Sequence, residues 1–103
     1  MSSLRRTSQI QGPPGPPGTA QGTPAAWTPG AISNGAFASL SVAVTGANVG
    51  FACFPAFSLV LPDGVWLWAQ TTVAGTVKVY MFNISGSPQT IGAGTIYVEV
   101  LTQ

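Results

Sequence analysis

The stretch TVKVYMFNI at residues 76–84 decides the fold class of this chain. Its side chains alternate between an aliphatic set and a second set formed by Lys78, Tyr80 and Phe82. Successive side chains of a β-strand point to opposite faces of the sheet, so this period of two predicts a strand with one buried face. The apolar residues do not follow the helical repeat of about 3.6 residues.

The same alternation predicts further strands on both sides of this stretch, with turn residues between them. The predicted strands are 38–45, 51–61, 65–71 and 95–101, and the predicted turns are 46–50, 62–64, 73–75, 85–89 and 92–94. Pro55 predicts an edge position or a bulge in its strand, because proline has no backbone N–H to donate. Turns recurring about every 8–12 residues are typical of a sandwich. We therefore expect residues 27–103 to form an all-β domain, a small antiparallel β-sandwich or jelly-roll-like head.

The second face of these strands carries large side chains instead of the Ser, Thr and Lys stripes that solvent favours. These side chains could form a second buried layer within the sandwich, or a subunit interface, where aromatic residues are enriched. A domain this small cannot bury the whole set internally, which favours an interface for the set. Lys78 and Glu99 could also pair across neighbouring strands. The candidate core or trimer contacts are Trp27, Trp66, Trp68, Lys78, Tyr80, Phe82, Tyr97 and Glu99.

Residues 11–20, QGPPGPPGTA, have a different pattern, with glycine at every third position and prolines between. The candidate stalk residues are Gly12, Pro13, Pro14, Gly15, Pro16, Pro17 and Gly18. Such triplets favour a triple helix, in which only glycine fits at the shared axis, but three triplets need another part of the chain to align them. The alternative is an independent polyproline-II spacer. We expect residues 12–26 to be a collagen-like stalk and connector.

Residues 1–11 are polar and are predicted to be an N-terminal arm. Arg5, Arg6 and Ile10 are the candidate anchoring residues, since guanidinium groups bind carboxylates and carbonyls of a larger assembly. The alternative for this segment is a disordered tail. The two arginines are not followed by the apolar stretch of a signal peptide, and the longest apolar run, 51–61, is too short to span a bilayer. We therefore expect synthesis in the cytoplasm and no insertion into a membrane.

Charged residues make up 5% of the chain, against about 25% in an ordinary soluble domain, and the formal net charge is +1. So few charges give little repulsion between molecules. The surface is therefore expected to be covered by further copies of the chain or by a larger assembly. The alternative is a surface made polar by Ser, Thr, Asn and Gln.

The residue types do not favour catalysis. The chain has no histidine, one cysteine and two carboxylates, Asp63 and Glu99. Cys53 has apolar neighbours and is expected to be a small buried hydrophobe. We expect no catalytic residues, metal or cofactor, since a general acid–base pair needs two groups converging in one pocket and a metal needs several ligands. Nucleic-acid binding is not expected either, because two adjacent arginines do not make a basic stripe.

The segment from residue 27 to 101 resembles the small β domains at the ends of phage and prophage fibre and decoration proteins. The matching features are a Trp-x-Pro opening at Trp27 and Pro29, a strand start at Gly64 and Val65, the run 74–77 with Asn83, Ser85 and Gly86, and a final strand over 94–100. Phage virion proteins also join an attachment segment to a trimeric β head through a collagen-like run.

The resemblance implies a homotrimeric, non-enzymatic virion protein that contacts the major capsid protein or other virion proteins. The chain is short for a host-binding fibre, which favours a capsid decoration, cement or head-fibre protein on the capsid surface. Two other functions stay open at this point. One is a fibre tip that binds a receptor or a host-surface glycan, and the other is a collagen-like bacterial surface protein.

Overall fold

The computed structural model describes residues 18–102, and this part of the chain contains nine strands and no helix. The strands are β1 (Thr19–Gln21), β2 (Ala25–Trp27), β3 (Gly30–Ile32), β4 (Phe37–Ala43), β5 (Cys53–Phe57), β6 (Val65–Val73), β7 (Thr76–Asn83), β8 (Gln89–Ile91) and β9 (Gly94–Leu101). All of their pairings are antiparallel. The prediction of an all-β domain built from antiparallel sheets is confirmed.

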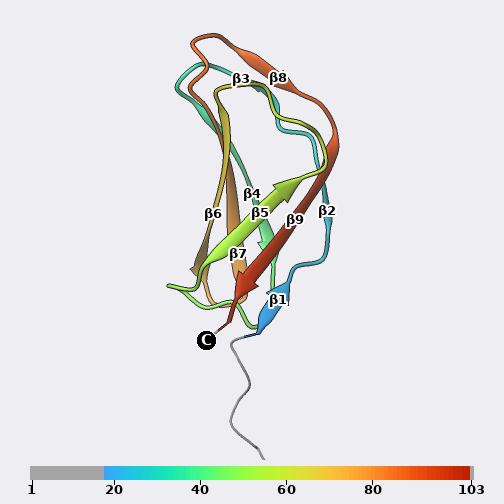
Figure 1. The fold of residues 1–103 in the computed structure, drawn as a ribbon, viewed down its shortest axis with the longest axis vertical. Coiled ribbons are helices and arrows are strands. Elements are labelled where there is room, and N and C mark those ends of the chain that lie inside the picture. The colour runs from blue at the N-terminus through green and yellow to red at the C-terminus, as the bar shows by residue number, and fades with distance from the viewer. Residues whose placement is uncertain (1–17, 103) are drawn as a thin grey trace, which may run out of the picture.

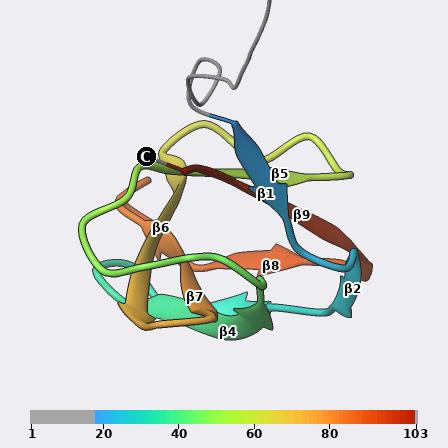
Figure 2. The same ribbon diagram turned by 90° about the horizontal axis from the view of Figure 1, so that it is seen from below.

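Two sheets face each other as the layers of the domain (Figures 1 and 2). In the first, the β9 sheet, strand β9 is central: β1 and β2 pair with it on one side and β5 on the other. In the second, the β7 sheet, strand β7 lies between β4 and β6. A two-stranded sheet of β3 and β8 lies at the end of the molecule away from β1 (Figure 1).

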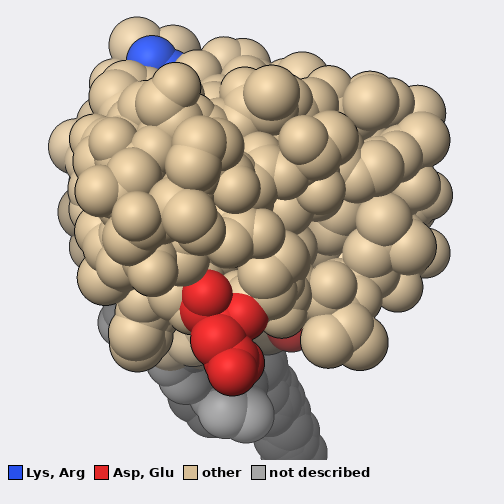
Figure 3. All heavy atoms as spheres, turned by 90° about the horizontal axis from the view of Figure 1, so that it is seen from above, with Lys and Arg blue, Asp and Glu red and all other residues tan. Residues whose placement is uncertain are grey.

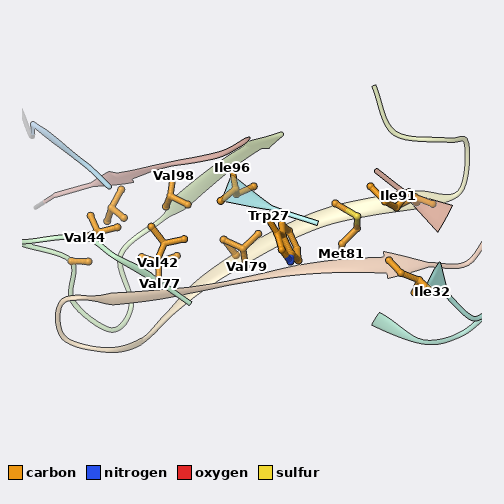
Figure 4. Packing of buried hydrophobic residues seen from close by; sticks show 14 residues of the cluster. Trp27, Ile32, Val42, Val44, Val77, Val79, Met81, Ile91, Ile96 and Val98 are labelled. Carbon is orange, nitrogen blue, oxygen red and sulfur yellow. The ribbon is translucent and has the colours of Figure 1, made fainter. Parts of the chain in front are cut away.

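The core lies between the two layers and is built from the inward residues of the alternating strands. In β7 the buried positions Val77, Val79 and Met81 have no exposed surface, as the alternation in 76–84 predicts. Ile96 and Val98 point from β9 toward them (Figure 4). Apolar side chains stabilise the fold by leaving water, by roughly 1.5–3 kcal/mol for a fully buried aliphatic side chain.

Strand β1 lies within the range predicted as stalk and connector, 12–26, and strand β2 crosses the end of that range. Thr19 is in register with Leu101 and Ala25 with Ile96, and between the two strands the N–H of Gly22 donates to the carbonyl of Val98 at 2.9 Å. The two strands therefore form one interrupted edge strand along β9. They are too short and too rich in alanine to show a period of two, so the sequence pattern did not predict them.

Other strand limits also differ from the prediction. The predicted strand 51–61 is a strand only over Cys53–Phe57. Short strands β3 and β8 were not predicted, and β8 begins at Gln89, inside the predicted turn 85–89. Three residues are too few to establish an alternation, which explains both omissions. Pro55 does lie in an edge strand, because β5 pairs only with β9, so the predicted edge position is confirmed.

Gly64 and Ser85 lie together where β6 begins and β7 ends. Gly64 has a φ of 85°, and a Cβ atom there would come within 2.6 Å of the Cα of Ser85. The N–H of Ile84 donates to the carbonyl of Gly64 at 2.8 Å. Both the backbone conformation and the close approach require glycine at this position. Two separate pieces of the sequence resemblance, at Gly64 and at Ser85, thus belong to one structural feature.

Candidate functional site

An exposed cluster of aromatic rings covers the outer side of the β7 sheet. We call it the aromatic face, and its residues are Phe37, Trp66, Trp68, Tyr80 and Phe82. They point outward because they alternate with buried residues of the same strands. Phe82 stands in register between Phe37 and Trp66, and Tyr80 stands in register opposite Trp68. The alternation of the three strands therefore gathers five rings on one surface.

Four rings of the aromatic face, those of Phe37, Trp68, Tyr80 and Phe82, contact one another. Trp68 and Tyr80 have centroids 5.0 Å apart, Tyr80 and Phe82 are stacked at 5.8 Å, and Phe37 lies 5.4 Å from Phe82. Ring pairs at these separations are worth about 0.5–1.5 kcal/mol beyond the area they bury. Much of the cluster still faces solvent, since Trp66 is 62% exposed and Phe37 52%. The face is thus an ordered apolar surface without a cover in the single chain.

Polar groups border the aromatic face on one side. The Nε2 of Gln70 donates to the hydroxyl of Tyr80 at 3.2 Å, and the Nζ of Lys78 lies 5.3 Å from the centroid of the Tyr80 ring. Ser41 and Gln70 flank Lys78 in register. A cation over an aromatic ring is attracted by the negative face of the π system. These contacts place Gln70 and Lys78 beside Tyr80, whose ring also packs against that of Trp68.

The outer side of the β9 sheet carries a second uncovered surface, a groove of about 320 Å³ that we call the Tyr97 groove. It is lined by Gln21, Gly22, Pro24, Phe54, Pro55, Ala56, Tyr97, Val98 and Glu99. Tyr97 is 47% exposed and Phe54 is 55% exposed. Glu99 is in register with Gln21 on one side and with Phe54 on the other. This surface therefore combines two aromatic rings with a carboxylate and an amide.

The proposed pairing of Lys78 with Glu99 is wrong. Lys78 lies on the outer side of the β7 sheet and Glu99 on the outer side of the β9 sheet, because their neighbours Val79 and Val98 both point into the core between the sheets. Figure 3 shows the basic and acidic atoms of the described residues on opposite sides of the view, separated by uncharged surface. The two residues lie on strands of different sheets, and the alternation of side chains does not show to which sheet a strand belongs.

The remaining predicted residues lie in other places. Trp27 ends β2 and is 8% exposed, with an edge-to-face contact at 5.9 Å to Phe57, so it belongs to the core. Gly18 is exposed and precedes β1. The predicted anchoring residues Arg5, Arg6 and Ile10, and the stalk residues Gly12, Pro13, Pro14, Gly15, Pro16 and Pro17, lie outside the described residues.

Phe37 and Phe54 belong to the two outer surfaces but were not among the predicted contacts. Phe37 is two residues before Ser39 and therefore lies on the same face of the strand, the outer one. Extending the predicted strand 38–45 by one residue would have identified Phe37. Phe54 lies in a run that is apolar at almost every position, so the sequence offers no signal for its direction.

Chemically reactive groups are sparse in the described part of the chain. Across residues 18–102 no group of three or more His, Cys, Asp or Glu side chains is close enough to hold a metal ion. No helix within this range could cross a membrane. Cys53 is partly buried: its Sγ lies 3.4 Å from the hydroxyl of Thr71 and 3.6 Å from the carbonyl of Phe51. Nothing in these contacts activates the thiol as a nucleophile.

Comparison of the chain with protein-family models, with curated proteins and with solved structures gave no match.

Proposed function

We propose that this chain is a non-enzymatic structural protein of a phage virion, a homotrimeric decoration or cement protein on the capsid surface. In this proposal residues 1–11 attach it to the major capsid protein or to another virion protein. Residues 12–18 form a short collagen-like stalk, and the β domain is the head. No cofactor, metal or nucleic acid takes part.

The observation that carries the proposal is the surface of the β domain. Both layers of the domain leave aromatic rings exposed on their outer sides: Trp66 of the β7 sheet is 62% exposed and Phe54 of the β9 sheet is 55% exposed. Within residues 18–102 the charged side chains are Asp63, Lys78 and Glu99. Exposed apolar patches with few charges mark interaction sites in soluble proteins. Association into a trimer would cover part of this surface. It would also align the Gly-Pro-Pro segments of the three chains.

The first experiment is the native mass of the purified full chain at micromolar concentration. We expect three times the 10.5 kDa of one chain.

The second experiment is addition of the full chain to capsids that lack it, compared with the Arg5→Ala/Arg6→Ala variant as a control for the arm. We expect the wild type to bind and the variant to bind more weakly. A stable monomer, or no affinity for such capsids, would overturn the proposal.

A second candidate function is binding of a host-surface glycan by the aromatic face. The supporting observation is the set of aromatic planes at Trp68 and Tyr80 with the donors Gln70 and Lys78 at their border. Sugars combine apolar C–H faces with hydroxyl groups, and such a surface offers partners for both. We would measure binding of the full chain to host cells. Loss of binding in Trp68→Ser but not in Val60→Ser, a change at a 98% exposed residue outside both aromatic surfaces, would support this candidate.

A further inference from the structure

The two uncovered surfaces are alike in exposure but differ in their position relative to the stalk. Tyr97 and Phe54 on the β9 sheet are 47% and 55% exposed, and Trp68 and Phe37 on the β7 sheet are 48% and 52% exposed. Exposure alone therefore does not say which surface a trimer would cover. The point at which the chain enters the β domain distinguishes them.

The chain enters the domain in the layer of the β9 sheet. The carbonyl of Gly18 accepts a hydrogen bond from the N–H of Thr102 at 2.9 Å, directly beyond the pairing of Thr19 with Leu101. Gly18 is also the last glycine of the triplets. No linker separates the triplets from β1, which lies with β5 and β9 in one layer, whereas β4 and β7 lie in the other (Figure 2).

A triple helix brings its three chains to one axis, at which only glycine fits. Three copies of Gly18 would therefore lie near that axis, and each would hold its own β9 sheet there through the hydrogen bond with Thr102. Packed sheets are about 10 Å apart, so the β7 sheet of each copy would lie farther from the axis by about that distance. The aromatic face would point away from the other copies.

From this placement we infer that the outer side of the β9 sheet, centred on the Tyr97 groove, is the surface through which three copies of this chain contact one another. The aromatic face stays open on the assembled head. This inference rests on the proposed trimer and on its collagen-like stalk, and it adds which surface forms the contact between the copies. The Tyr97 groove has the composition of an interface: Tyr97 and Phe54 supply aromatic contacts, and Gln21 and Glu99 supply a polar border.

Two matched pairs of variants of the full chain test the inference. Tyr97→Ser is compared with Trp68→Ser, and Phe54→Ser with Phe37→Ser, because the members of each pair are almost equally exposed. Native mass is measured over a range of concentrations. We expect each β9-sheet variant to weaken the trimer about tenfold or more, as loss of a central aromatic contact does. The β7-sheet variants should leave the mass unchanged.

Hydroxyl-radical labelling of the wild type provides a second measurement that needs no variant. We expect Tyr97 to be protected in the trimer and Trp68 to react. A wild-type trimer that dissociates in Trp68→Ser or Phe37→Ser, or that is unaffected by both β9-sheet variants, overturns this inference alone. A monomeric wild type overturns the proposed trimer and this inference with it.

Discussion

Asn83 is a buried polar side chain whose hydrogen-bonding atoms all have partners. It has no exposed surface; its Nδ2 donates to the carbonyls of Ile32 at 2.8 Å and Ser87 at 2.9 Å. Its Oδ1 accepts from the N–H of Ser85 at 3.0 Å and from the Ser85 hydroxyl at 2.7 Å. This one residue therefore ties β3 to the turn that follows β7.

We expect Asn83→Ala to lower the free energy of unfolding by about 2–4 kcal/mol, because it leaves buried backbone groups without partners. Ser87→Ala is the matched control: its side chain is exposed and its carbonyl is kept, so the change should stay within about 0.5 kcal/mol. Denaturant unfolding of both variants measures the difference. Equal stability of the two would show that the Asn83 contacts contribute little.

A proline blocks the open edge of strand β5. The backbone N–H of Ser58 donates to the carbonyl of Thr95, and the backbone N–H of Leu101 donates to the carbonyl of Ala52, both at 2.9 Å. The two pairs of residues are therefore hydrogen-bonded pairs of the β5–β9 ladder. Hydrogen-bonded and non-bonded pairs alternate in antiparallel sheets, which makes Pro55 and Val98 a non-bonded pair. The nitrogen of Pro55 thus faces the open edge, where a groove of about 500 Å³ separates β5 from β6.

We expect Pro55→Val to increase aggregation without lowering the stability of the fold. The substitution adds an N–H to the open edge, and free edges pair with other chains. It removes no hydrogen bond to β9. Light scattering over time, compared with Pro88→Val outside the strands, measures the effect. Faster aggregation of the Pro88 variant, or none in either, would contradict this role of Pro55.

The molecule as a whole has few charged residues, and within residues 18–102 Lys78 and Glu99 lie on the outer sides of different layers. We therefore expect the trimer to be held by apolar contacts. Raising the salt concentration from about 0.1 M to about 1 M shortens the Debye length from about 10 Å to about 3 Å and screens exposed ion pairs. Native mass should not fall over this range, and sulfate should strengthen the trimer. Dissociation at high salt would indicate that ion pairs hold it.

Local sequence features predicted the all-β class, the inward and outward residues of the long strands, and an edge position or a bulge at Pro55. They did so because alternation and the missing N–H of proline are local properties. The pairing and packing of distant strands place Lys78 and Glu99 on opposite outer sides, bring Trp27 into the core and gather five rings on one aromatic face. These three features could not be predicted from local patterns. The same is true of the pairing by which β1 and β2 extend the β9 sheet. These features depend on which strands pair and which layers face each other. Strand pairing and layer packing are set by contacts between residues that are distant in the sequence.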